Sequence, residues 1–185
     1  TNWDGKVTAQ FPGPESTAEA VDGGVKFPAT VALHSKRRLL YISDDILSIG
    51  IKVFCADTFQ FRFAIGSPGV GAGQFKKPFA LTLDEDTDEL FVADNKLDRV
   101  SVFCAREGKF VRSFGSPGIG PGQLRQARGI AIHPCTKEII VADYGNQRLQ
   151  VFDRDGQFAR FVYDNFRGMY GLAVHPRTGV GYVAD

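Results

Sequence analysis

Short apolar runs separated by turn residues fill this chain, and none of them shows the spacing of an amphipathic helix. In the clearest stretch, four such runs lie at residues 129–134, 138–143, 148–153 and 157–162. The second is almost continuously apolar, as in a strand that is covered on both faces, and Asp155-Gly156 before the fourth is a hairpin signal. These patterns predict four short antiparallel β-strands and an all-β fold.

The same four-strand pattern occurs repeatedly. Its most regular part, two apolar residues, a small residue and Asp, lies at residues 41–44, 91–94, 140–143 and 182–185. The four aspartates are 50, 49 and 42 residues apart. The earlier copies predict strands at 28–34, 39–44, 51–54 and 59–65, and at 78–84, 89–94, 99–103 and 109–114. A fixed period in this range indicates a repeat architecture in which each unit buries its apolar face against its neighbours.

Four-stranded units that stack around an axis make a β-propeller, and we expect an incomplete one here. Residues 4–11 match residues 107–114 at a constant offset of 103, which predicts an isolated fourth strand at 1–11. The expected blades follow at 28–65, 78–114 and 127–162, with the first half of another at 171–185. Such an arc leaves strand edges open to aggregation, so we expect these residues to be a piece of a longer protein. A stable open arc is the alternative.

Several motifs recur in register along the chain. They are Gly-[Ile/Leu]-Ala-[Ile/Val]-His-Pro, Val-Ala-Asp, Asn-x-Arg-[Leu/Val]-x-Val-Phe, Asp-Gly-x-Phe, Phe-Gly-x-x-Gly and Gly-Gln-Phe. This combination resembles the NHL repeat, and the resemblance spans essentially the whole chain. The first copy departs from the pattern, because Gly50 stands where Arg99 and Arg148 stand in the others. The resemblance implies an NHL-type β-propeller that usually closes with six blades, of which an arc of about three and a half is present.

Composition and charge exclude little. The chain is 43% hydrophobic and 23% charged, which is ordinary for a globular protein. With 22 Lys and Arg against 21 Asp and Glu, the net charge is +1, so binding to nucleic acid or anionic lipid would need a local patch. No stretch approaches the ~18 consecutive apolar residues that a spanning helix needs.

The three cysteines argue against a disulfide framework. Cys55 and Cys104 occupy equivalent places in successive repeats, about one blade apart, and Cys135 lies in a different hairpin. We expect three reduced, semi-buried thiols, which favours a reducing compartment such as the cytoplasm. The absence of a Cys-x-x-Cys pair gives no support to a metal site, and no cofactor is predicted.

A basic and aromatic surface is the strongest functional signal. In a propeller, the loops from the last strand of one blade to the next blade emerge on the same side as the turns between the second and third strands. The residues of these segments predicted to bind a partner are Lys76, Lys77, Lys96, Arg125, Arg128, Tyr144, Asn146, Arg167 and Tyr170. They suit a peptide, an acidic partner or single-stranded RNA with stacked bases. A solvated rim whose charges only maintain solubility is the alternative.

Two other patterns have structural explanations. The glycine-rich segments 66–74 and 115–123 look like phosphate loops, but each leads into a strand rather than a helix N-terminus, so we interpret them as linkers between blades. Asp94 with Arg99, and Asp143 with Arg148, lie five residues apart across a turn. We expect a repeated ion pair or hydrogen bond that fixes this turn.

Three histidines form a weak candidate for metal binding. His34, His133 and His175 fall at the same end of the inner strand in three repeats, with Asp84 at that place in the remaining one. Imidazoles at one level of the channel could bind zinc, as in the amidating lyases that the NHL family resembles. His-Pro is also an ordinary end of this strand, so no metal is predicted. The acidic segment 84–89 lacks the glycine and the distal Glu of a calcium loop and is expected to be a solvated hairpin.

Three functions remain open at this point. The leading interpretation is a non-enzymatic scaffold that binds a protein or peptide, as the resemblance implies for NHL domains attached to ubiquitin-ligase or other adaptor modules. RNA binding on the basic surface is the second. A channel-metal enzyme such as a lyase is the third, although no serine, cysteine or carboxylate has a recognisable activating partner.

Overall fold

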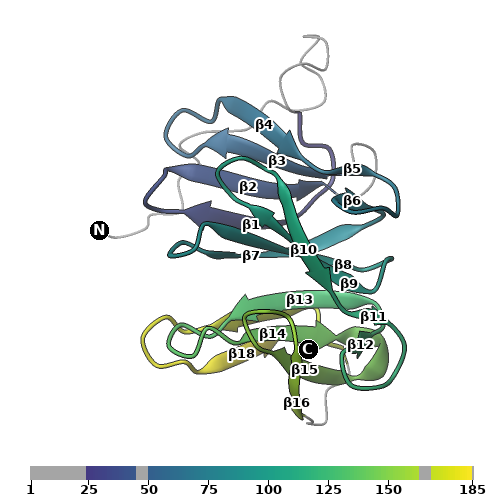
Figure 1. Ribbon diagram of the computed structural model, residues 1–185. Helices are drawn as coiled ribbons and strands as arrows, with labels where there is room; N and C mark the ends of the chain where they lie inside the picture. The colour runs from purple at the N-terminus through teal and green to yellow at the C-terminus, as the bar shows by residue number, and fades with distance from the viewer. Residues whose placement is uncertain (1–23, 45–49, 163–167, 185) are drawn as a thin grey trace.

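The computed structural model describes residues 24–44, 50–162 and 168–184. Within these ranges three four-stranded antiparallel sheets and a final two-stranded sheet follow one another along the chain (Figure 1). One single-turn 3-10 helix, η1 (Tyr144–Asn146), interrupts the described β-structure. The prediction of an all-β fold with four-stranded antiparallel sheets is confirmed, whereas the isolated strand predicted at 1–11 lies outside the described residues.

Each large sheet is a meander, in which every strand pairs with the next strand of the chain. The first sheet contains β1 (Pro28–His34), β2 (Leu39–Asp44), β3 (Gly50–Cys55) and β4 (Phe61–Ile65). The second contains β7 (Pro78–Asp84), β8 (Glu89–Asp94), β9 (Arg99–Cys104) and β10 (Phe110–Phe114). The third contains β13 (Ala127–Ile132), β14 (Ile139–Asp143), β15 (Arg148–Phe152) and β16 (Phe158–Val162). The last contains β17 (Gly171–Val174) and β18 (Gly181–Ala184).

Two short parallel pairs lie in the linkers between the large sheets. They are β5 (Ser67–Pro68) with β6 (Gln74–Phe75), and β11 (Ser116–Pro117) with β12 (Gln123–Leu124). The sequence did not predict them, because a two-residue strand carries no measurable periodicity. They fold each glycine-rich linker into a compact loop at one end of the sheets (Figure 1).

Equivalent residues occupy equivalent places in successive sheets. Val92 of β8 lies opposite Leu81, and Val141 of β14 lies opposite Ile130. Val183 of β18 likewise lies opposite Leu172 of the inner strand β17. The repeated sequence motif is therefore a repeated position in the fold, as a propeller requires.

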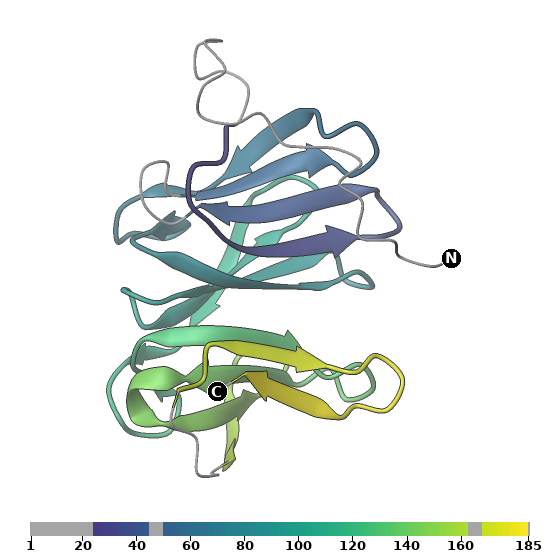
Figure 2. The same cartoon turned by 180° about the vertical axis from the view of Figure 1, so that it is seen from behind.

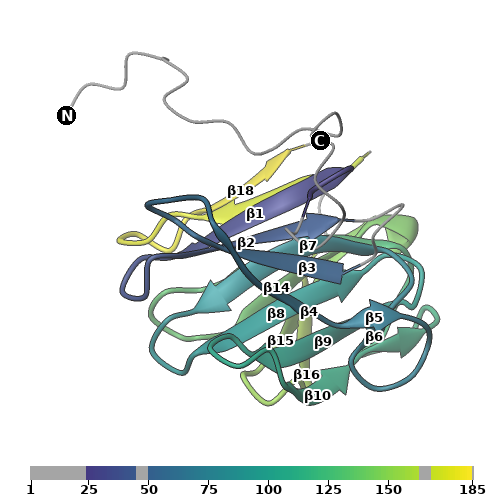
Figure 3. The same cartoon turned by 90° about the horizontal axis from the view of Figure 1, so that it is seen from above.

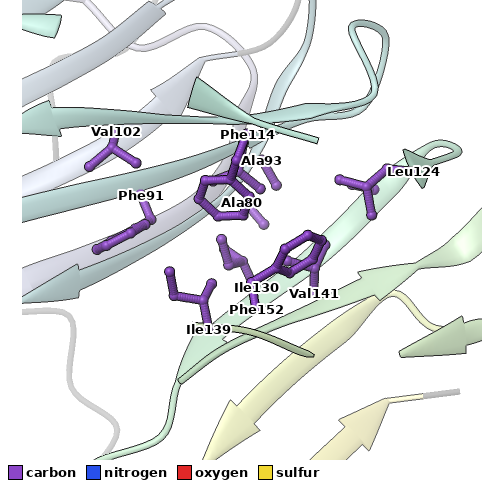
Figure 4. Close-up of a cluster of buried hydrophobic side chains, with 12 residues drawn as sticks. Ala80, Phe91, Ala93, Val102, Phe114, Leu124, Ile130, Ile139, Val141 and Phe152 are labelled. Carbon is purple, nitrogen blue, oxygen red and sulfur yellow. The ribbon is translucent and has the colours of Figure 1, made fainter. Parts of the chain in front are cut away.

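Apolar side chains fill the space between neighbouring sheets. The inner strands β1, β7, β13 and β17 follow one another side by side, from purple to yellow in Figure 2, which brings the faces of successive sheets together. The view from above looks along this stack, so the sheets overlap in it (Figure 3). Figure 4 shows the cluster between the second and third sheets, where Phe91, Ile130 and Phe152 meet. A second cluster joins the first and second sheets, and a smaller one around Met169 joins the third sheet to the last. Each sheet thus depends on its neighbours for burial.

Strand β15 is covered on both faces. All five of its residues are buried, including Gln150, whose amide donates to Asp143 over 2.9 Å. Phe152 packs on Phe114 with ring centroids 4.9 Å apart. The turn into β16 needs Gly156, which has φ +88°, because an added Cβ would meet the Phe114 ring at 2.5 Å. This turn lies where the Asp-Gly pair predicted a hairpin.

Candidate interaction face

One end of the sheets carries both linkers and the turns between the second and third strands. We call this end the loop face and define it by residues 66–77, 95–98, 115–126, 144–147 and 168–170, together with Phe79 and Arg128 at the start of the inner strands. It lies at the right of Figure 1 and at the left of the reversed view in Figure 2. The predicted partner-binding residues that the structure describes belong to this face.

A buried carboxylate holds each linker to the adjacent turn. Asp94 has no exposed surface and accepts from the backbone N–H groups of Lys76 and Lys77 at 2.8 and 3.0 Å. It also accepts from the N–H groups of Lys96 and Leu97 in the following turn. Asp143 repeats the linker contact by accepting from the Arg125 N–H at 2.7 Å. The recurring Asp of the sequence motif is therefore structural: it fixes the backbone from which the basic side chains project.

A recurring arginine holds the tip of each linker. Arg99 donates to the carbonyls of Val70, Gly71 and Gln74. Arg148 makes the equivalent bonds to Ile119, Gly120 and Gln123.

The predicted Asp–Arg pairs have different outcomes. Arg148 pairs with Asp143 at 2.8 Å, so that pair is confirmed. In the second sheet the guanidinium of Arg99 turns to the linker carbonyls, and Asp94 is occupied by backbone N–H groups. Each glycine-rich loop connects two consecutive sheets. Its carbonyls bind the arginine of the sheet that follows it.

Three of the predicted residues form one aromatic and cationic cluster. The Arg128 guanidinium carbon lies 3.6 Å from the centroid of the Tyr144 ring and 4.3 Å from that of Tyr170. The two tyrosine rings are 5.6 Å apart. Hydrogen bonding from Arg128 and Tyr144 lowers the pKa of the Tyr170 hydroxyl, which is consistent with a cation held against it. The fold thus brings together residues from β13, from η1 and from the position just before β17.

A lysine group lies next to this cluster. The backbones of Lys76, Lys77 and Lys96 converge on Asp94. The Lys77 ammonium lies 5.6 Å from the Phe79 ring centroid, and the Arg128 guanidinium lies 6.0 Å from the same centroid. Phe79 therefore joins the two groups.

Phe79 is a contact residue that the sequence reasoning missed. It occupies the same register in β7 as Arg128 does in β13, since each is the extra residue of a β-bulge. Aligning the inner strands position by position would have placed Phe79 beside Arg128.

The remaining predicted residues have different roles. Arg125 packs on Gly145, where an added Cβ would meet the Arg125 Cγ at 2.6 Å. Asn146 donates to the Gly118 carbonyl at 2.9 Å and to Asp143, so its amide is engaged within the protein. Arg167 lies outside the described residues.

The three candidate metal-binding histidines make separate contacts. His34 is buried, and its Nε2 lies 2.8 Å from the Asp88 carboxylate in the next sheet. The Nδ1 atoms of His133 and His175 accept from backbone N–H groups of their own turns. No three His, Cys, Asp or Glu side chains are placed to hold a metal ion within the described ranges. His133 and His175 thus close their own turns, whereas His34 contacts the neighbouring sheet.

The acidic hairpin is exposed to solvent, as expected, and it also links three sheets. Asp86 pairs with Lys36 of the first sheet at 2.9 Å and with Lys137 of the third at 2.8 Å. These two lysines lower the pKa of Asp86 to about 2. Asp88 also pairs with Arg37. Sequence spacing alone did not reveal that basic turns of both neighbouring sheets lie beside this hairpin.

The cations of the two ends of the molecule have different partners. At the end opposite the loop face, Lys36, Arg37 and Lys137 all meet carboxylates. On the loop face, none of four cations forms an ion pair with another residue of the described ranges. These four are Lys76, Lys96, Arg125 and Arg128. The positive charge of these four side chains is therefore not neutralised by an ion pair within the described residues.

The cysteines differ in exposure. All three are free thiols, but Cys55 is buried, Cys104 is half-buried and Cys135 is exposed, so the expectation of three semi-buried thiols is wrong for the first and the last. Hydrogen bonding by Thr58 is the main cause that lowers the pKa of the Cys55 thiol to about 6.

No helix in the described part of the chain has the length and apolarity to cross a membrane.

Comparisons with known proteins agree with this architecture. Among solved structures, the RRP9 WD40 repeats match 79% of this chain and 41% of their own, with a TM-score of 0.65 and 10% identity. A chain of a nidogen/laminin complex matches with a TM-score of 0.71 and 19% identity, over 85% of this chain and 56% of its own. A chain of Kuenenia stuttgartiensis hydrazine synthase matches 86% of this chain and 42% of its own, with a TM-score of 0.63 and 19% identity. The protein thus spans between two-fifths and three-fifths of the length of these chains.

The sheets and these likenesses define the class of the protein, which is a β-propeller fold. The sequence profile of the NHL repeat matches residues 124–152, from β12 to the end of β15. The match, together with the recurrence of the same positions in the neighbouring sheets, supports an NHL-repeat β-propeller. A comparison with curated protein sequences finds no match.

Proposed function

We propose that this protein is a non-catalytic interaction scaffold that binds a protein or peptide through its loop face. The observation that supports this proposal is that Lys76, Lys96 and Arg125 extend from a braced backbone without an ion pair to another described residue. By contrast, Lys36, Arg37 and Lys137 at the opposite end meet carboxylates. A rigid backbone reduces the entropy that binding must overcome. Charged groups that lack an internal partner can meet an acidic one at little cost of rearrangement.

The solved structures lend support at the level of the fold. A similar chain belongs to a complex of nidogen with laminin, so a sheet arrangement of this kind occurs in a protein that engages another protein. Propellers of the NHL and WD40 type are commonly non-catalytic scaffolds. The likeness to hydrazine synthase places the same fold in an enzyme, and for this reason the proposal depends on the loop face rather than on the fold.

The test is affinity capture with two triple variants matched in charge. The first changes the loop face by Lys76→Glu, Lys96→Glu and Arg125→Glu. The second changes the opposite end by Lys109→Glu, Arg154→Glu and Arg177→Glu. The proposal expects proteins that are retained by the unchanged protein and by the second variant but lost by the first.

Nuclease treatment and added salt distinguish protein binding from the alternative of RNA binding. Protein capture that survives nuclease and changes little with salt agrees with the proposal. Capture that requires RNA and falls steeply as salt is added contradicts it, because displaced counterions give nucleic acid binding that dependence. Equal capture by both variants also contradicts it.

A further inference from the structure

Three of the inner strands, β7, β13 and β17, each have one side chain directed toward the loop face at or just before their first residues. In β7 and β13 the pairing with the next strand skips one residue, Phe79 and Arg128 respectively. Tyr170 stands at the same place before β17, where its N–H donates to the Ala184 carbonyl at 2.9 Å. A β-bulge redirects the side chain of its extra residue, and bulges are frequent beside functional sites. Three successive sheets thus present Phe, Arg and Tyr at one level.

The arginine of this set lies in the corner between two tyrosine rings. Tyr144 and Tyr170 lie 3.6 and 4.3 Å from the guanidinium carbon, so both rings are within cation–π range. This stacking fixes the orientation of a side chain that would otherwise sample many rotamers. The Tyr170 hydroxyl accepts from one part of the guanidinium, and the other N–H donors remain for an anion.

No carboxylate within the described ranges forms an ion pair with Arg128, and the motif carboxylates of the second and third sheets are already engaged. Asp94 and Asp143 are both fully buried and bound to backbone N–H groups. Lys96 and Arg125 add positive charge on the same face. A planar cation with fixed orientation and no internal counter-ion is the arrangement that binds a carboxylate through two parallel hydrogen bonds.

We propose that the Arg128 edge, framed by Tyr144 and Tyr170, binds a Glu or Asp side chain of an acidic peptide, an inference that rests on the proposed function of the loop face. A peptide fits better than RNA because two of the three aromatic rings are already in use. Phe79 and Tyr144 are half-buried and lie against cations, so they offer little open surface for stacking bases. Tyr170 is 56% exposed and provides an apolar surface for a residue beside the carboxylate.

The test uses fluorescence anisotropy with three labelled probes: an oligoglutamate peptide, an oligoglutamine peptide of equal length and an oligouridylate. The oligoglutamate is expected to bind, and the oligoglutamine is not. Arg128→Lys keeps the charge but removes the planar edge, so it should weaken oligoglutamate binding about tenfold or more. Lys96→Gln removes a charge from the same face and should weaken it only about twofold. Arg154→Gln, at the opposite end, should leave it unchanged.

Two outcomes would overturn the inference. If Lys96→Gln costs as much affinity as Arg128→Lys, the general charge of the face accounts for binding. If the oligouridylate binds more tightly than the oligoglutamate with the same dependence on Arg128, the ligand is a nucleic acid. Thermal unfolding of each variant shows whether the fold is retained, and Tyr170→Leu, which removes one stacked ring, gives an independent test with an expected loss of about threefold or more. If the oligoglutamate assay fails while proteins are still captured through the loop face, the Arg128 site alone is rejected. If neither the oligoglutamate nor any protein binds the loop face, the proposed function is rejected as well.

Discussion

Four backbone N–H groups converge on the carboxylate of Asp94, which has no exposed surface. Asp94→Asn would replace one acceptor oxygen with an NH₂ group facing these donors. We therefore expect the free energy of unfolding to fall by about 2–4 kcal/mol, because a charged hydrogen bond is lost and buried donors are left without an acceptor. Urea unfolding followed by circular dichroism measures the change.

Asp57→Asn is the matched control for this substitution. Asp57 is half exposed and pairs with the exposed side chain of Arg38. Surface pairs of this kind contribute about 0–1 kcal/mol, so the control should remain close to the unchanged protein. A loss at Asp94 no larger than the loss at Asp57 would show that the buried carboxylate is not what holds the linker.

Residue-level predictions from the sequence succeeded where the chemistry is local. Arg148 and Asp143 pair as their spacing predicted, since both side chains leave the same edge of a hairpin. Arg99 stands in the same register but turns to three linker carbonyls, because its aspartate is already saturated by backbone donors. The position of a charge could be predicted, but its partner depended on a loop that sequence spacing does not place.

In the linkers between the sheets, the two equivalent arginines, Arg99 and Arg148, differ in burial and pairing. Arg148 is buried and joins Asp143 to the linker, whereas Arg99 is half-buried and bonds to the linker alone. Arg148→Lys should cost about 2 kcal/mol of stability, because an ammonium cannot reach the same set of acceptors, and Arg99→Lys about 1 kcal/mol. Native-state hydrogen exchange should show faster opening of residues 115–122 in the first variant and 66–73 in the second. Equal effects would contradict the assigned difference in burial.

The acidic hairpin between β7 and β8 predicts a loss of stability in acid. Lys137 and Lys36 lower the pKa of Asp86 from 3.8 to about 2, and Arg37 and His34 lower that of Asp88. The folded state therefore binds fewer protons than the unfolded state in this range, so stability is full above about pH 4 and is lost as the pH falls toward 2. Urea midpoints measured across this range should fall less steeply in Asp86→Asn/Asp88→Asn than in the unchanged protein. Parallel curves would contradict a role for these pairs.

Element-level predictions were most accurate where a repeat supplied several copies of the pattern. Strands β1, β2, β7 and β8 begin and end at the predicted residues. The parallel pairs in the linkers were missed, since their order comes from arginine and carboxylate contacts rather than from periodicity. On the candidate site, the shared face of Arg128, Tyr144 and Tyr170 could be predicted from topology, but their stacking could not, because it depends on the bulges.

At the scale of the whole molecule, burial decreases from the middle sheets to the last one. Strands β8 and β15 are buried along nearly their full length, while β17 and β18 have no fully buried residue. In a stack of repeats, stability is close to a sum of each unit and its interfaces. A protein of these 185 residues should therefore exchange the amides of β17 and β18 first and those of β8, β9, β14 and β15 last.

A substitution at the interface between the third and last sheets separates this gradient from simple fraying of exposed strands. Met169 is 1% exposed and packs with Ala142 and Leu149. Met169→Ala should cost about 2–5 kcal/mol at this interface, which is enough to speed exchange in β17 and β18 strongly. Protection in β8 and β9 should change little, because another cluster covers them. Equal acceleration in all sheets would instead mean that the stack unfolds as one cooperative unit, with interfaces too strong to open separately.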